Sequence, residues 1–203
     1  MGPKIRLQCI WSFLLVPLSL AWGAAEKPVD LATLQKALKS YQSIDRLDVD
    51  FKQTKILKDI NLELKSEGHL TVKAPDQVEW KIVKPEPLTV TLEQQKVTVK
   101  SSSGTQSYQQ SENPSTKDRE SYATLLTWLK LDAGAIADKY NVTELAKNHY
   151  RFVSKDPHEA MIKALEMEMA PDNHVSKLIF DEVSGDQMRL AFGKPKVTYR
   201  SQK

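Results

Sequence analysis

Histidines, serines and closely spaced carboxylates are the side chains of this sequence that could act in catalysis or bind a metal. The four histidines, His69, His149, His158 and His174, are scattered, without the H-x-H or H-E-x-x-H spacing of a zinc site. No serine stands in a G-x-S-x-G element, the sharp turn that presents a nucleophile in many hydrolases. The sequence therefore predicts a protein that is not an enzyme and that holds no metal.

The remaining polar patterns indicate solvated structure rather than chemistry. Two acid–histidine pairs have the surroundings of exposed turns: Asp156 with His158, and Asp172 with His174. Glu166 and Glu168 alternate with Leu165 and Met167, as on a strand with one wet face, and are not expected to form a catalytic dyad. Neither a P-loop nor a dinucleotide-binding glycine pattern occurs, so no cofactor is expected.

The N-terminus has the features of a secretory leader. Lys4 and Arg6 precede an apolar run from 10 to 20, and the small residues of 21–25 suit a signal peptidase. The run is short for a membrane span, so a cleaved signal peptide over residues 1–25 is predicted. Residues 26–203 would then form a single domain. The only cysteine, Cys9, lies in the leader, so the mature chain has no disulfide and no thiol chemistry.

Charge excludes one large class of partner. The chain has 29 basic and 26 acidic residues, and two of the basic ones belong to the leader, so the remainder is close to neutral. It contains no basic block of the kind that binds phosphate backbones. No nucleic-acid partner is expected.

Residues 68–87 form the clearest structural pattern. Leu70 and Val72 alternate with polar residues, the turn Ala74–Asp76 follows, and Val78 and Trp80 then resume the alternation. This pattern predicts a β-hairpin with an indole on its apolar face. Trp80 either fills the core or lines a pocket, and the hairpin by itself leaves both open.

The rest of the chain is predicted to be one large antiparallel sheet with two short helices. Asp30 is a suitable N-cap for a helix whose leucine stripe continues to Tyr41. A second apolar stripe predicts a helix over 121–131, with a short helical turn over 133–139. In the polar segment 101–120, a short polar strand is expected from a turn at 103–104 to about Tyr108, and the rest is expected to be largely a loop. Further strands are expected around 47–51, 62–64, 88–92, 97–99, 150–152, 165–169, 178–180, 188–192 and 197–199. A polar turn at Lys58 and Asp59 is expected to join the first two of these strands, and a second turn is expected at 94–95. Because a long twisted sheet must curl, the predicted class is α+β: an incomplete, half-open antiparallel β-barrel with short helices covering its concave apolar face.

Several short motifs resemble the outer-membrane lipoprotein carrier family of the LolA/LolB type. They are the segment 50–53 with its F-x-Q element, the hairpin from Gly68 through Pro75 and Trp80 to Pro85, and blocks at 140–142, 152–155, 178–180 and 185–192. One position departs from the family pattern. LolA proteins usually carry an arginine, implicated in ligand transfer, immediately before the hairpin proline. This chain has Ala74 at that position. Lys73, one residue earlier, is expected on the other side of the strand. Besides lipoproteins, another lipid, such as a glycolipid or a polyene-linked acyl group, therefore remains a candidate cargo.

The resemblance implies a periplasmic carrier that binds acyl chains in an apolar cavity and shuttles them from an inner-membrane donor transporter to an outer-membrane acceptor. It implies a monomer whose partners are acylated lipoproteins or other lipid cargo. The alternative is an envelope sensor or regulatory binding module on the same fold, which recognises lipidated or misfolded envelope proteins. The ligand-binding residues expected from the apolar face are Phe51, Val78, Trp80, Leu92, Phe152, Met167, Leu178, Phe180 and Leu190, with Leu125 and Leu129 of the second helix as a lid.

Overall fold

The computed structural model describes residues 27–93, 96–109, 128, 131–156, 158, 160 and 162–200. Its helices are α1 (Leu31–Gln42), the 3-10 turn η1 (Lys58–Ile60) and α3 (Ala133–Lys139). Its strands are β1 (Lys27–Pro28), β2 (Ile44–Leu57), β3 (Leu62–Lys73), β4 (Gln77–Lys84), β5 (Leu88–Glu93), β6 (Lys96–Ser101), β7 (Gly104–Gln109), β8 (Tyr140–Ala146), β9 (His149–Ser154), β10 (Ile162–Met169), β11 (Val175–Glu182), β12 (Gln187–Phe192) and β13 (Lys196–Tyr199).

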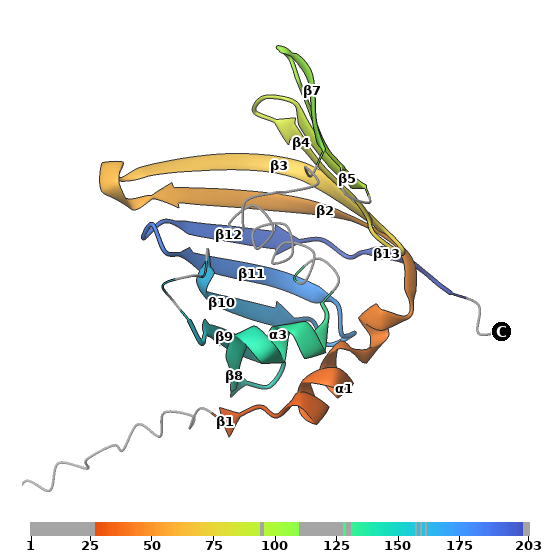
Figure 1. Ribbon diagram of the computed structural model, residues 1–203, viewed down its shortest axis with the longest axis vertical. Helices are drawn as coiled ribbons and strands as arrows, with labels where there is room; N and C mark the ends of the chain where they lie inside the picture. The colour runs from red at the N-terminus through yellow and green to blue at the C-terminus, as the bar shows by residue number, and fades with distance from the viewer. Residues whose placement is uncertain are drawn as a thin grey trace, which may run out of the picture.

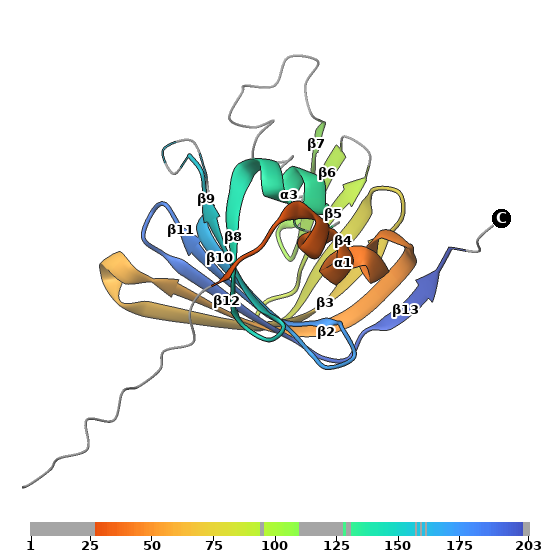
Figure 2. The ribbon, with the colours of Figure 1, turned by 90° about the horizontal axis from the view of Figure 1, so that it is seen from below.

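All of these strands belong to one antiparallel sheet. Their order is β1-β8-β9-β10-β11-β12-β2-β3-β4-β5-β6-β7, and β13 pairs with the first part of β2 beside β12. The sheet curls into an open trough with α1 and α3 on its concave side, as Figures 1 and 2 show. Between described residues, the two ends of the strand order do not pair with each other, so the barrel stays half open. The predicted fold class is confirmed.

The central hairpin has the predicted register. Leu70 lies opposite Trp80 and Val72 lies opposite Val78, so the alternating apolar residues share the concave face. The polar turn predicted at Lys58 and Asp59 is the 3-10 turn η1 that joins β2 to β3. The strands predicted on both sides of the helical region are likewise present.

Helix α1 closes one part of the trough. It begins as predicted at Asp30, whose Oδ1 accepts a hydrogen bond from the backbone N–H of Thr33 at 2.7 Å. Leu34 and Leu38 are completely buried, whereas Leu31 in the first turn is 44% exposed. Only the later part of the predicted stripe therefore packs in the core. Helix α3, which packs against α1, has its N-cap at Asp132.

One close approach in the sheet depends on a glycine. Phe51 of β2 lies directly across from Gly68 of β3, and its ring lies over the space where a side chain would stand. This position brings the Phe51 ring against Trp80, with ring centroids 4.2 Å apart. The glycine of the G-x-L element thus lets a core phenylalanine support the indole of the neighbouring strand.

Two strands were missed by the pattern, and four predicted segments fall outside the residues that the structure describes. Strands β8 and β1 pair with each other at one end of the sheet, where a short segment beside a helix gives little periodic signal. The leader (1–25), the predicted turn at 94–95, the loop over 110–120 and the leucines of the helix predicted over 121–131 lie outside the described residues. Within that predicted helix, Trp128 is described as helical and buried.

Candidate functional site: an apolar cavity on the concave face

A cavity of about 870 Å³ lies between the curved sheet and its helices. Ligand pockets in proteins are typically about 300–1,000 Å³, so this one is at the large end of that range. Its wall draws side chains from both halves of the sheet, β2 to β6 on one side and β10 to β12 on the other. Because these strands alternate inward and outward residues, the inward set supplies a continuous apolar lining.

Many wall residues are apolar but not fully buried. Trp80, Val90, Leu178 and Met188 pack against the core while keeping part of their surface accessible from the cavity. A filled core would cover such surface, since interiors are packed to crystal-like density. The inward face of the sheet therefore encloses space rather than only side chains.

Six of the residues expected to bind ligand lie in the cavity wall. They are Val78, Trp80, Leu92, Leu178, Phe180 and Leu190. They come from four strands, β4, β5, β11 and β12, that the fold brings around one space. The period-two pattern identified them because it places every second residue on the concave face.

Three further residues of that set are core residues behind the wall. Phe51, Phe152 and Met167 are at most 2% exposed and are absent from the cavity lining. Phe152 packs edge-on against Trp128, and Phe51 supports Trp80 from behind. Phe51 and Phe152 thus lie behind residues of the wall, and Met167 is part of the buried core. Leu125 and Leu129, the expected lid, lie outside the described residues.

The structure adds wall residues that the sequence analysis did not select. They are Tyr41 and Ile44 near the α1–β2 junction and several residues of predicted strands: Leu47, Val49, Leu70, Val72, Val90, Val97, Val175, Met188 and Phe192. Most share the inward parity of the residues that were selected. Extending the alternation along every strand would have found most of them, and Tyr41 already ends the predicted stripe of α1, whereas nothing local to the α1–β2 junction indicates that Ile44 faces the cavity.

Polar groups border the cavity at two places. At one, the carboxylate of Glu182 forms an ion pair with Lys55, which also lies 3.7 Å from Asp186. At the other, Lys73 and Asp76 stand where β3 turns into β4. Lys73 was expected on the other side of the strand. The register agrees with that expectation, because Lys73 lies opposite Arg46, which is hydrogen-bonded to Asp48 on the face away from Leu47 and Val72.

Tyr41 ties helix α1 to the sheet at the cavity wall. Its hydroxyl oxygen accepts a hydrogen bond from the backbone N–H of Val175 at 2.5 Å. Burial raises the pKa of Tyr41 to about 12, an increase that the bond from Val175 partly opposes. The folded protein therefore strongly favours the neutral phenol at this position.

We expect Tyr41→Phe to change how stability responds to alkaline pH. The raised pKa means that the phenol's contribution to stability is complete below pH 10 and is lost as the pH rises toward 12. Wild type should lose up to about 2–3 kcal/mol from this group in that window, and the phenylalanine variant should not. At neutral pH the variant should be about 1 kcal/mol less stable, because the N–H of Val175 loses its partner.

Urea denaturation of both proteins between pH 8 and pH 12 measures this difference. Burial also raises the pKa values of Tyr140 and Tyr150, but both groups are present in both proteins and cancel in the comparison. A stability gap between the two proteins that stays constant across that range would contradict the assignment.

The residues with catalytic or metal-binding side chains stand on the convex face or in turns. Glu166 pairs with Arg151 at 2.5 Å and with His149 at 3.4 Å, and Glu168 pairs with Lys177 at 2.8 Å. His174 contacts Asp172 within its turn. Among the described residues, no group of three or more His, Cys, Asp or Glu is placed to hold a metal ion. These contacts are those of a charged outer sheet face.

None of the helices in the described part of the chain is both long enough and apolar enough to cross a membrane. Comparison with known proteins gives one family. The profile of the family described as "Outer membrane lipoprotein carrier protein LolA" matches residues 42–203. No curated protein matches the chain.

Solved structures of similar shape are remote in sequence. A LolA superfamily protein from Nitrosomonas europaea is 11% identical, with 83% of this chain and 94% of that chain covered and a TM-score of 0.41. The lipoprotein LppX from Mycobacterium tuberculosis is 12% identical, with 84% and 97% covered and a TM-score of 0.45. A chain of the MucA/MucB complex from Pseudomonas aeruginosa is 10% identical, with 86% of this chain but 59% of that chain covered and a TM-score of 0.45.

Proposed function

The chain belongs to the outer membrane lipoprotein carrier LolA family, whose profile covers its residues 42–203, and from this membership we propose that it is a periplasmic carrier of acyl chains. In this proposal the leader directs the chain across the inner membrane. The mature protein takes an acylated lipoprotein or a related lipid from an inner-membrane donor and delivers it to an outer-membrane acceptor. The acyl chains occupy the cavity on the concave face.

The observation that carries the proposal is the large cavity lined by accessible apolar side chains. Each buried methylene is worth about 0.8 kcal/mol, so a sixteen-carbon chain costs about 12 kcal/mol to leave in water. Such a chain cannot cross an aqueous compartment alone. An aliphatic wall that includes the flexible Met188 can shelter it without requiring one fixed shape.

Delivery in this proposal follows the order of affinities. The sequence has no nucleotide-binding motif, so the carrier itself supplies no energy for transfer. The donor must load the cavity, and the acceptor must bind the chain more tightly than the carrier does. The hydroxyl of Tyr41 anchors the C-terminal end of α1 to Val175 at the cavity wall. In this proposal, movement of α1 away from the sheet would have to break that hydrogen bond.

Native mass spectrometry of the protein purified from a cell envelope tests carriage. We expect a population heavier than the polypeptide by the mass of an acylated species, and release of that species when detergent is added. The stripped protein should then take up a soluble single-chain lipid with 1:1 stoichiometry. A protein that is always bare and takes up no acyl compound would contradict the proposal. Capture of a protein partner by such an empty chain would favour the sensor.

A further inference from the structure

Strand β3 has an unpartnered edge in its first part, next to the turn η1. Its neighbour β4 pairs with it only from Glu67 onward, so residues 62–66 face no described strand on that side. On their other side the same residues pair with β2 without a register shift. Figure 1 shows the β2–β3 hairpin reaching beyond the end of β4. The backbone N–H and C=O groups directed toward the open side are therefore available to a further strand.

Exposed apolar side chains surround this edge. Leu62 and Leu64 are 42% and 49% exposed, and they continue the inward parity of Leu70. Ile60 in η1 is 66% exposed, and Val83 near the end of β4 is 45% exposed. A proline, a bulge or an inward-pointing charge usually protects such an edge, and residues 62–66 have none of these. The edge is thus apolar on one face and open to pairing.

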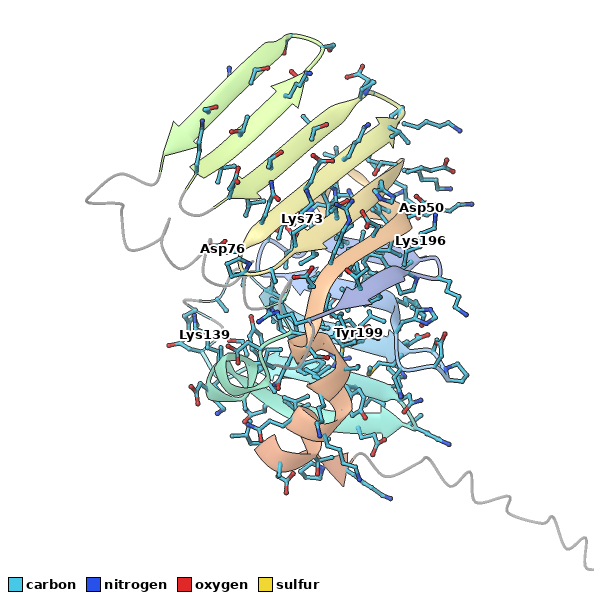
Figure 3. The ribbon with its side chains drawn as sticks, turned by 90° about the vertical axis from the view of Figure 1, so that its right-hand side faces the viewer. Asp50, Lys73, Asp76, Lys139, Lys196 and Tyr199 are labelled. Atoms are coloured by element: carbon cyan, nitrogen blue, oxygen red, sulfur yellow. The ribbon has the colours of Figure 1, made fainter. Side chains whose placement is uncertain are left out.

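The charges of the edge are weakly engaged within one copy of the chain. Glu63 and Lys65, which point to the convex face, lie 3.9 Å apart, and their side chains are 55% and 76% exposed. Other charges of that face have closer partners. The Asp50 carboxylate contacts His69 at 2.8 Å and lines a small pocket with Lys196, which lies next to it in Figure 3. Glu63 and Lys65 can therefore still take up a partner of opposite charge.

The edge is complementary to a second copy of itself. When two copies pair antiparallel about a two-fold axis at Leu64, each Glu63 lies opposite Lys65 of the other copy. Each Leu62 then lies opposite Ser66. An axis at Glu63 or at Lys65 would place like charges directly opposite each other, which is destabilising. The free edge 62–66 has the same length as the gap beyond β4, so each copy would fill the gap of the other.

We propose that this edge is a homodimer interface in which two copies pair through residues 62–66. Paired residues of antiparallel strands share a face, so the two concave faces lie on the same side of the joined sheet. The pairing covers Leu62 and Leu64 of both copies and brings Ile60 of each copy toward Val83 of the other. The interface is small, so we expect a reversible dimer with a Kd of about 10–100 μM. The monomer that the family resemblance implies would prevail in dilute solution.

Sedimentation velocity of the mature protein from about 1 to 500 μM tests the dimer. Glu63→Lys and Lys65→Glu should each weaken association by about tenfold or more, because either change places like charges opposite each other. Mixing the two variants, or combining both changes in one chain, should restore association, since opposite charges then face each other again. The control Lys100→Glu reverses an exposed charge on β6, which is paired on both sides, and it should dimerise like wild type.

A cysteine at the two-fold axis tests the register. The only cysteine of the chain, Cys9, lies in the leader. Residues that face each other in an antiparallel pair have Cα atoms about 4.5–5.5 Å apart, which a disulfide can span. Leu64→Cys should therefore give a disulfide-linked dimer when oxidised glutathione is added. Leu62→Cys should give little, because its two copies would stand about 13 Å apart along the strands.

Several results would overturn the proposal. One is a mature protein that stays monomeric up to about 500 μM. Another is a dimer that both charge reversals leave intact, that Lys100→Glu weakens equally, or that the mixed variants do not recover. Monomeric protein that binds phosphatidylglycerol vesicles, and loses this binding in Leu62→Gln/Leu64→Gln, would assign the leucines to a lipid surface. The carrier function would survive each of these results, because each copy encloses its own cavity.

Discussion

Placing two tryptophans in the cavity, Val90→Trp with Leu178→Trp, is expected to abolish cargo binding while leaving the fold intact. Val90 and Leu178 line the cavity from opposite halves of the sheet, and neither is fully buried. New rings at these positions would occupy space that the acyl chain needs. Excluding four methylenes costs about 3 kcal/mol, so the affinity for a single-chain lipid should fall by about a hundredfold or more.

Stability of the same variant tests whether the space is empty. Overpacking a filled core costs about 1–3 kcal/mol for each enlarged residue, whereas a ring added to an open cavity should change the free energy of unfolding by less than about 1 kcal/mol. Dye displacement and urea denaturation measure the two effects. The control Thr91→Trp/Ile179→Trp enlarges the adjacent positions on the same strands, which face outward, and it should bind lipid like wild type.

Two results would contradict the expectation for the Val90/Leu178 variant. One is normal lipid affinity in a folded protein, which would place the acyl chain outside this cavity. The other is a loss of several kcal/mol of stability, which would mean that the concave face is filled by its own side chains.

Among Gly→Ala substitutions at the glycines that the structure describes, Gly68→Ala should lower the stability of the protein most. An alanine Cβ at this position would lie 2.2 Å from the carbonyl oxygen of Lys81 and 2.5 Å from Cζ of Phe51. The first contact is with the backbone of the neighbouring strand, which cannot withdraw without breaking the β3–β4 ladder. We expect a loss of about 3 kcal/mol or more, although the same change in an unobstructed strand is usually stabilising by a few tenths to 1 kcal/mol.

Gly193→Ala is the matched control for this substitution. Its Cβ would meet nothing closer than the carbonyl oxygen of Asp50 at 3.7 Å, which is an ordinary contact. Its stability should remain within about 1 kcal/mol of wild type in urea denaturation. In the double variant Gly68→Ala/Phe51→Leu, removal of the ring should recover part of the loss, so the two changes should be non-additive. Full additivity, or a harmless Gly68→Ala, would show that Phe51 does not lie over the glycine.

The sequence predicted the sheet well because its strands are half buried. Leu47, Val49 and Phe51 alternate with charged residues, and Val78 and Trp80 alternate with polar ones in the hairpin. Each strand therefore shows which of its faces is apolar. Asp30 marked the start of α1 through its hydrogen-bonding chemistry. Strand β8 escaped because only Tyr140 and Val142 of its seven residues are buried. Strand β1 is two residues long and is defined by its partner rather than by its own pattern.

The sequence by itself determined which residues face inward, since alternation with period two is a local property of an extended backbone. Only the tertiary structure decided which of these inward residues border space and which fill it. Phe51 and Trp80 carry the same signal in the sequence, yet Phe51 is covered by its neighbours while Trp80 faces the cavity. The difference arises from the curvature of the sheet and the position of the helices, which depend on contacts far apart in the chain.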